Sequence, residues 1–183
     1  MIENTARPEG NIMPKEKVAY TAIDSPIGKL LIAATEVGVV RIVFENGGWE
    51  SALEDLGRRI GPVVEDRAPL TGLIGQLTEY FAGERKEFTI DLDLRLASGF
   101  RRTALEHLRT IPYGETESYA EVAEAAGSPR AMRAVGSACA NNPIPLVIPC
   151  HRVVRSDGTL GGYGGGLGIK EQLLDMERGI RPL

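Results

Sequence analysis

The pattern of apolar and polar positions changes near residue 97. Before this point, short runs rich in β-branched residues are separated by the turn sequences SPIG and TEVG, as in an antiparallel meander. The expected strands of this meander are residues 18–24, 29–34 and 39–44. A further alternating segment, FTIDLDL at 88–94, predicts a half-buried strand.

Two helices are expected between the third and fourth of these strands. The first spans 51–61 and begins with the capping-box spacing of Ser51 and Glu54. The second spans about 69–82 and stops at a glycine. Residues 18–97 are therefore expected to form a small N-terminal α+β domain, in which no catalytic cluster is evident.

The second half of the chain, 98–183, has helical periodicity. After a helix over about 100–111, a short helix opens with the capping-box spacing of Ser118 and Glu121. Another helix is expected to start with Ser128 at its cap and a proline in its first turn. Two short helices joined at a glycine are typical of a helix-turn-helix, although many helical hairpins share this pattern. The small residues of the second helix suit close approach either to DNA or to the core of the protein.

Charge is divided unevenly over a chain whose net charge is −4. Residues 1–97 hold 11 basic and 16 acidic side chains, whereas 98–183 hold 10 and 9, and nine of those ten bases are arginine. This asymmetry permits local nucleic-acid binding without demonstrating it.

Several classes of protein are excluded or disfavoured by composition. No stretch reaches the roughly 18 apolar residues of a membrane span. Residues 1–17 are polar and are expected to be a flexible tail rather than a secretory signal. Two cysteines and two histidines without a CxxC motif make a metal site improbable, and they favour a reduced, cytoplasmic setting.

Candidate chemistry is concentrated in NNPIPLVIPCHRVVRSDG, residues 141–158, where Cys150 and His151 are adjacent. A thiol becomes a nucleophile when a base or positive charge favours the thiolate. Prolines stiffen the approach to the cysteine, and arginines follow it. A buried cysteine beside an incidental histidine is the alternative, and Cys139 is interpreted in that way, as structural or incidental.

The motif IPCHRVV resembles the active-site signature of the O6-alkylguanine-DNA alkyltransferases, also called methylated-DNA–protein-cysteine methyltransferases. IPYGETESYAEVA, RAVGSACANNPIPLVIPCHRVV, GYGGGL and KEQLLDMERG follow in the order of that family, over about 98–179. The N-terminal half is a looser match to the family's small ribonuclease-H-like domain. The resemblance implies an α+β protein whose C-terminal helical domain carries a helix-turn-helix.

The resemblance also implies catalytic roles. Cys150 would accept the alkyl group, and His151 would act as its base through a water molecule, oriented by Glu177. Asn142 would tie the recognition helix to the active-site turn. Tyr119 would crowd the 3′ phosphate and help to protonate the leaving guanine.

Contacts with DNA follow from the same resemblance. Arg133 would enter the base stack as the target nucleotide swings out, and Tyr119, Ala134, Ser128 and Arg152 would lie against the DNA. Double-stranded DNA containing O6-alkylguanine, bound through its minor groove, is the expected partner. No membrane and no obligate protein partner are expected.

The base pocket would be lined by Tyr163 and by the backbone around Val153 and Gly164, with Lys170 near it. Gly164 departs from the serine or alanine of many relatives, which would give a freer loop. Residues 100–102, FRR, replace a motif that usually ends in glutamine and add positive charge near the helix start.

The implied activity is irreversible direct-reversal repair. One alkyl group would pass from O6-alkylguanine, and also from O4-alkylthymine, to Cys150 in a single turnover, without metal or cofactor. The buried O6 atom requires the nucleotide to be flipped out of the duplex. Three alternatives are considered. The first is a relative that binds the lesion without transfer, which the presence of Cys150 opposes. The others are a cysteine hydrolase, which would turn over repeatedly, and a sequence-specific transcription factor.

Overall fold

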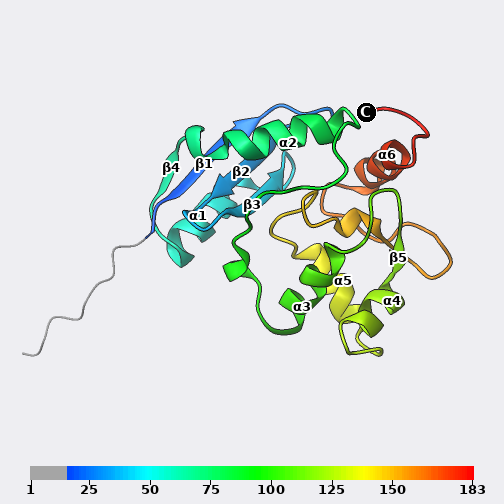
Figure 1. The fold of residues 1–183 in the computed structure, drawn as a ribbon. Coiled ribbons are helices and arrows are strands. Elements are labelled where there is room, and N and C mark those ends of the chain that lie inside the picture. The colour runs from blue at the N-terminus through cyan, green and yellow to red at the C-terminus, as the bar shows by residue number, and fades with distance from the viewer. Residues whose placement is uncertain (1–15) are drawn as a thin grey trace, which may run out of the picture.

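A computed structural model describes residues 16–183 (Figure 1). The first half contains a four-stranded sheet in the order β3-β2-β1-β4. β1 (Val18–Ile23), β2 (Leu30–Ala34) and β3 (Val39–Phe44) form the expected antiparallel meander. β4 (Val63–Glu65) was not predicted, and it pairs parallel to β1.

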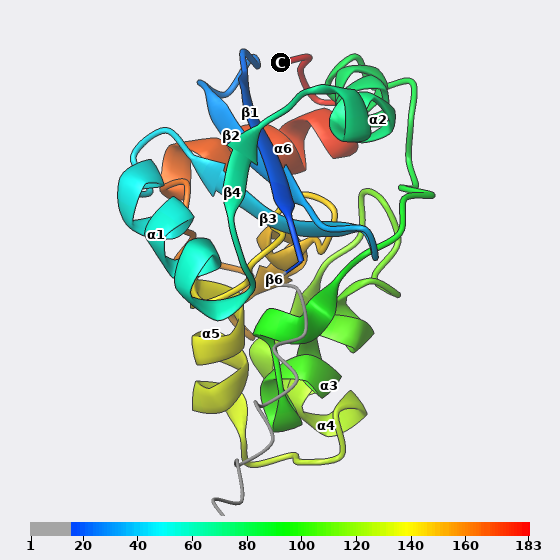
Figure 2. The same ribbon diagram turned by 90° about the vertical axis from the view of Figure 1, so that its left-hand side faces the viewer.

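Two helices cover opposite faces of this sheet (Figure 2). α1 (Trp49–Arg59) packs Leu56 against one face, and α2 (Thr71–Phe81), which follows a short 3₁₀ turn, packs Leu73 against the other. All residues of β2 are buried because this strand is covered on both faces. The strand therefore reads as a continuous apolar run in the sequence.

Two details of the N-terminal prediction are wrong. α1 begins two residues before Ser51, and the Ser51 hydroxyl donates to the Gly48 carbonyl at 2.9 Å instead of capping the helix. Residues 88–94 make only an isolated bridge, between Leu92 and Val39, and then enter a 3₁₀ turn. Asp93 accepts bonds from the Thr35 hydroxyl and a backbone amide, which favours this turn over an extended strand.

The predicted tail lies mostly outside the described residues, which begin at residue 16. Within the described part, Glu16 accepts a hydrogen bond from the Glu36 amide at 3.0 Å and pairs with Arg95, and Lys17 pairs with Asp66. Residues 16 and 17 therefore belong to the edge of the domain rather than to a tail.

The second half is helical, as expected. α3 (Gly99–Leu108), α4 (Tyr119–Ala125) and α5 (Met132–Ala140) pack against one another, and α6 (Leu167–Glu177) closes the chain. The capping box of Ser118 and its partner at the third helical position is present in α4. α4 and α5 form the predicted helix-turn-helix, within a C-terminal helical domain.

The start of α5 differs from the prediction. Ser128 and Pro129 lie in a turn, in which the Ala131 amide donates to the Ser128 carbonyl at 2.8 Å, and the helix begins only at Met132. Proline favours a turn as readily as a first helical position, and the sequence pattern does not distinguish these two cases.

A two-stranded parallel ladder aligns the functional segments of the second half. β5 (Glu117–Ser118) pairs with β6 (Val153–Val154). Tyr119 follows β5 directly, and Cys150 lies three residues before β6. The ladder therefore brings the start of the helix-turn-helix beside the segment 141–150, which leads from α5 to Cys150 and is called the cysteine loop below.

The two halves share one hydrophobic core. β3 is an edge strand, and its Ile42 amide donates to the Pro143 carbonyl of the cysteine loop at 2.8 Å. The Phe44 ring packs edge-on against Tyr163, with 5.5 Å between ring centroids. Across the described part of the chain, every helix is too short or too polar to traverse a bilayer.

Candidate active site

A clamped loop carries the candidate nucleophile. Asn142 donates through Nδ2 to the Ile148 carbonyl at 2.8 Å and accepts from the Ile144 amide at 3.0 Å. Leu146, at the turn of this loop, has a φ of 74°, which is uncommon for a residue other than glycine. Asn142 thus joins the end of α5 to the residues just before Cys150.

Cys150 opens the short 3₁₀ helix η3 (Cys150–Arg152), and only 3% of its surface is exposed. Burial raises the pKa of the Cys150 thiol to about 11, while a hydrogen bond from Asn142 and the charge of Lys170 oppose the rise. Burial raises the pKa of the Cys139 thiol further, to about 12. Both thiols are therefore protonated at neutral pH, and Cys150 needs a base to remove its proton before it can act as a nucleophile.

His151 has the geometry of that base. Its Nε2 lies 2.8 Å from Glu177 Oε1, and both side chains are buried. Burial lowers the pKa of His151. The nearby charge of Glu177 raises this pKa and that of Arg152 lowers it, with a net lowering, so the ring is neutral at pH 7. A carboxylate only accepts hydrogen bonds, so Nε2 carries the proton and Nδ1 is left as the basic atom. Among the described residues, Nδ1 is buried and has no hydrogen-bond partner.

Glu177 is kept ionised by an unusually complete set of donors. Arg152 binds it with two bonds of 2.9 Å, from Nε to Oε2 and from Nη2 to Oε1, and the Gly114 amide donates to Oε2 at 3.1 Å. Although burial alone would raise the pKa of Glu177, His151 and Arg152 hold it far below its usual value.

The predicted DNA contact at Arg152 is wrong. Only 6% of this residue is exposed, and its remaining terminal nitrogen donates to the Ile111 carbonyl at 2.6 Å. Its guanidinium is therefore committed to the interior, where it positions Glu177.

Tyr80 is a functional candidate that the sequence did not reveal. It lies on α2, in the half of the chain where no catalytic cluster was evident, and it is fully buried. Its hydroxyl donates to Glu177 Oε1 at 2.6 Å and lies 3.3 Å from His151 Nε2. Burial, followed by the charge of Glu177, raises the pKa of Tyr80 well above its usual value, so the hydroxyl stays protonated. An aromatic residue at helical spacing indicates only a core position.

Lys170 forms a buried hydrogen bond to the backbone just after η3. It is completely buried on α6, and its Nζ donates to the Val153 carbonyl at 2.6 Å. Val153 is also fully buried. Neither residue belongs to the lining of the cavity at Cys150, and their place beside the base pocket stays a prediction.

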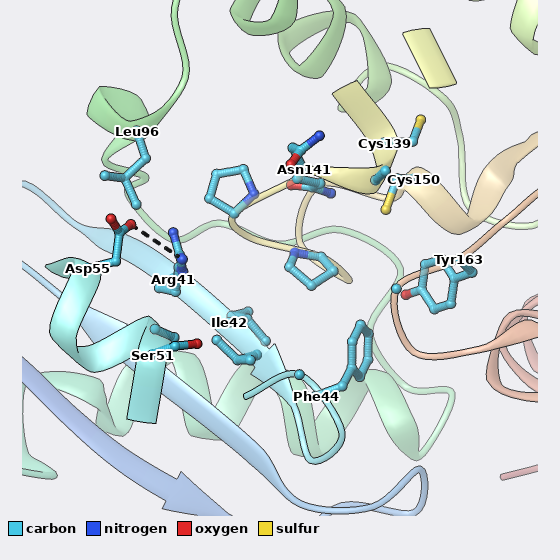
Figure 3. Close-up of a pocket in the computed structure, with 18 of the residues that line it drawn as sticks. Arg41, Ile42, Phe44, Ser51, Asp55, Leu96, Cys139, Asn141, Cys150 and Tyr163 are labelled. Carbon is cyan, nitrogen blue, oxygen red and sulfur yellow. Dashed lines mark ion pairs between the residues drawn. The ribbon is translucent and has the colours of Figure 1, made fainter. Parts of the chain in front are cut away.

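That cavity has a volume of about 470 Å³ and lies between the two halves (Figure 3). Cys150, Tyr163 and Gly164 line one end of it, and the role of the latter two in holding the base stays a prediction. Burial raises the pKa of Tyr163, and its hydroxyl has no hydrogen-bond partner within the described residues. This end therefore combines a thiol, an aromatic wall and a free hydroxyl.

Tyr119 packs beside the glycine-rich segment that continues from this end. A Cβ atom at Gly161 would collide with the Tyr119 ring and hydroxyl, so only glycine allows this approach. Burial raises the pKa of Tyr119, with smaller contributions from the two cysteines. The phenol is therefore protonated at neutral pH and able to donate.

The remaining predicted DNA residues lie on or near α5. Arg133 and Ala134 are exposed on this helix, and Ser128 is half-buried in the turn before it. Within residues 16–183, Arg133 forms no ion pair with an acidic side chain. Those residues also contain no group of three or more histidine, cysteine or acidic side chains that could hold a metal ion.

Comparison with known proteins identifies the family of this chain. Residues 18–94 match the ribonuclease-like domain of 6-O-methylguanine DNA methyltransferase, and residues 99–179 match its DNA-binding domain. A methylated-DNA–protein-cysteine methyltransferase of Mycolicibacterium paratuberculosis is 46% identical, over 90% of this chain and 95% of the relative. A constitutive enzyme of the same name from Bacillus subtilis is 37% identical, over 87% and 94%.

Solved structures agree with this assignment. The Mycobacterium tuberculosis OGT in complex with DNA has a TM-score of 0.77 and 38% identity, with 91% of this chain and 95% of that chain covered. The O6-methylguanine-DNA methyltransferase of Pyrococcus kodakaraensis has a TM-score of 0.63 and 26% identity, with 87% and 98% covered. Together with the thiol, imidazole and carboxylate described above, these matches show that the chain belongs to the 6-O-methylguanine DNA methyltransferase family.

Proposed function

We propose that this protein repairs DNA by direct reversal, as a methylated-DNA–protein-cysteine methyltransferase that moves an alkyl group from guanine O6 to Cys150. The observation that carries this proposal is the hydrogen-bonded pair His151 and Glu177 next to Cys150, which lines a cavity, on the fold of that family. Sulfur forms a bond to the alkyl carbon as the bond from that carbon to O6 breaks. The thioether product has no easy leaving group, so each protein molecule reacts once.

The thiol proton must leave as sulfur attacks, and His151 is placed to receive it. Nδ1 is the free basic atom of the ring, and a bridging water would connect it to the neighbouring thiol. The imidazolium formed in this way is stabilised by Glu177, which remains a carboxylate. A neutral His151 and a protonated Cys150 in the resting protein fit this order of events.

The departing guanine needs a proton in return. Tyr119 is a protonated phenol beside the cysteine loop, and we assign it the role of donor to the base. The net reaction therefore moves one proton from the thiol to guanine, and it requires no oxidant or reductant. O4-alkylthymine presents the same alkyl–oxygen bond and is proposed as a second substrate.

DNA is proposed to bind along the helix-turn-helix through its minor groove. After Met132 in its first turn, α5 exposes small side chains and one long cation, Arg133, which suits close approach to the groove without base-specific readout. The O6 atom is inaccessible in a duplex, so the nucleotide has to rotate into the pocket. Arg133 would fill the resulting gap.

The proposed site of action is the cytoplasm. Cys139 and Cys150 are both free thiols, and Cys150 must remain reduced to act as an acceptor. A reduced compartment preserves this thiol until it meets a lesion.

Intact-mass measurement tests the proposed reaction. The protein is incubated with a duplex that contains one O6-methylguanine, and we expect a single methyl adduct on the peptide that contains Cys150. Methylation of Cys139, or the repair of several lesions in the duplex by each protein molecule, would contradict the proposal. Repeated turnover would instead indicate a hydrolase.

Glu177→Gln should slow transfer more than it weakens DNA binding, because an amide cannot stabilise the His151 cation. It also removes the partner of buried Arg152, at a cost of about 3–5 kcal/mol in the free energy of unfolding. The variant is therefore measured alone and combined with Arg152→Met, which removes the unpaired charge. Single-turnover rates and duplex affinities are compared for the folded fraction. Parallel losses of rate and affinity would show that Glu177 is structural.

Tyr80→Phe tests the contribution of the N-terminal half to catalysis. Without the tyrosine hydroxyl, more of the negative charge on Glu177 Oε1 acts on His151, so the pKa of His151 should rise. As the pH is lowered, the rate of reaction with O6-benzylguanine should therefore start to fall at a higher pH than in the wild type. Loss of the hydrogen bond should also reduce the free energy of unfolding by about 1 kcal/mol. Tyr113→Phe is the control, since the Tyr113 ring contacts Tyr80 without a hydrogen bond to Glu177. An unchanged pH profile in Tyr80→Phe would limit Tyr80 to packing.

A further inference from the structure

The cavity at Cys150 continues well beyond the space that a methyl group needs. Its volume of about 470 Å³ is within the range of pockets that hold drug-sized ligands. Figure 3 shows Cys150 and Tyr163 at one end and Arg41 and Asp55 at the other, with β3 and the cysteine loop between them. The end of the cavity at Arg41 and Asp55, called the far arm below, therefore opens into the same space as the reacting sulfur.

Charge in the far arm is strongly unbalanced. The charged residues that line the cavity are three arginines and one aspartate: Arg41, Asp55, Arg59 and Arg101. One aspartate oxygen, Oδ2, lies 3.6 Å from Arg41 Nη2 and 3.5 Å from Arg59 Nη1, and both distances are longer than a good hydrogen bond. Asp55 instead makes its short bond, 2.7 Å, to Arg58, which does not line the cavity. The arm therefore keeps an excess of positive charge, and Arg41 and Arg59 make no short hydrogen bond to its one carboxylate.

Arg41 is less exposed to solvent than Arg59, so its charge is the more poorly solvated of the two. Its side chain is 22% exposed, compared with 43% for Arg59. Burial lowers the pKa of Arg41, and the charge of Arg59 lowers it further, although Asp55 opposes both effects. A guanidinium group keeps its proton at neutral pH. The neighbouring positive charges of Arg41 and Arg59 therefore favour a bound anion rather than loss of a proton.

We infer that this arm binds the anionic distal end of an extended O6 adduct, such as a carboxylate on a benzyl or longer alkyl group, through Arg41 and Arg59. This inference rests on the proposed alkyl transfer to Cys150. The carboxylate takes no part in bond making, and the same sulfur–carbon bond forms as the carbon–O6 bond breaks. Binding energy from the distal end would favour adducts with negative charge over neutral adducts of the same shape.

A matched pair of free-base probes tests the inference. O6-[4-(carboxymethyl)benzyl]guanine and its neutral carbamoylmethyl counterpart differ in charge and hardly in size, and a second pair with a longer spacer covers the length of the arm. The wild-type protein should react with the carboxylates about 3- to 10-fold faster, the effect of a partly exposed charged contact. Arg41→Gln and Arg59→Gln should each reduce this preference, and Asp55→Asn should increase it.

The controls separate the possible failures. Arg102→Gln removes a nearby exposed charge that pairs with Glu106 and does not line the cavity, so the preference should persist. Unmodified O6-benzylguanine should react equally with every variant, and a failure of that reaction at Cys150 would count against the proposed function itself. Equal rates for both members of each pair, or an equal effect of Arg102→Gln and Arg41→Gln, would overturn the subsite. It would also be overturned if Arg41→Gln weakened duplex binding without changing the preference, because the arm would then hold a DNA phosphate.

Discussion

Cys150→Ser should reduce methyl transfer from an O6-methylguanine duplex to the uncatalysed level while duplex affinity is retained. A serine hydroxyl is a far weaker nucleophile than a thiolate, and a neutral imidazole activates it poorly for attack on an alkyl carbon. The substitution replaces one buried atom by a smaller one at the start of η3, so the Asn142 clamp and the helix-turn-helix should stay in place. Intact mass measures the transfer, and fluorescence anisotropy measures the affinity.

Cys139→Ser is the matched control for this result. Cys139 also borders the cavity and is also buried, but it lies on α5 and not beside His151. Its replacement should leave the stoichiometry of one methyl per protein and change the rate little. Residual methylation of Cys150→Ser that disappears only when Cys139 is replaced as well would show that both thiols accept alkyl groups.

Local sequence patterns predicted most elements of the fold but not all of their boundaries. The meander and the capping box at Ser118 depend on short-range hydrogen bonds and were identified correctly. β4 is only three residues long and is defined by its partner β1, so no local pattern marks it. The misplaced start of α5 has a similar cause, because Pro129 fits a turn and a helix start equally well.

The predicted site followed the motif around Cys150, and its errors lie where tertiary contacts decide the role. Arg152 follows His151 in the sequence, yet its role is set by Glu177, 25 residues away in sequence and adjacent in space. Tyr80 is even more distant from the motif, 71 residues before His151. Tyr80 lies on an otherwise apolar face of α2, and the sequence does not indicate that its hydroxyl bonds to Glu177. The sequence thus indicates which groups react, while the fold determines which groups position them.

Arg133→Ala should slow repair of O6-methylguanine in duplex DNA by about 10- to 100-fold, the equivalent of the few kcal/mol that nucleotide flipping requires. The exposed side chain projects from α5, and we propose that it occupies the gap left in the base stack. Free O6-benzylguanine needs no flipping, so its reaction with Cys150 should be nearly unchanged. Arg133→Lys should recover part of the duplex rate, since lysine keeps the charge and loses the planar fork.

The contrast between duplex and free base is the decisive measurement for Arg133, and Arg130→Ala supplies its control. Arg130 is an exposed arginine in the turn before α5, so its removal changes the local charge equally without opening a gap in the stack. Its variant should lose only the affinity of one phosphate contact, a loss that diminishes as salt is raised. The defect of Arg133→Ala should instead persist at saturating duplex and at high salt, because it arises after binding. Equal losses on duplex and free base would show that Arg133 supports the pocket, and an unchanged duplex rate would make it an ordinary surface arginine.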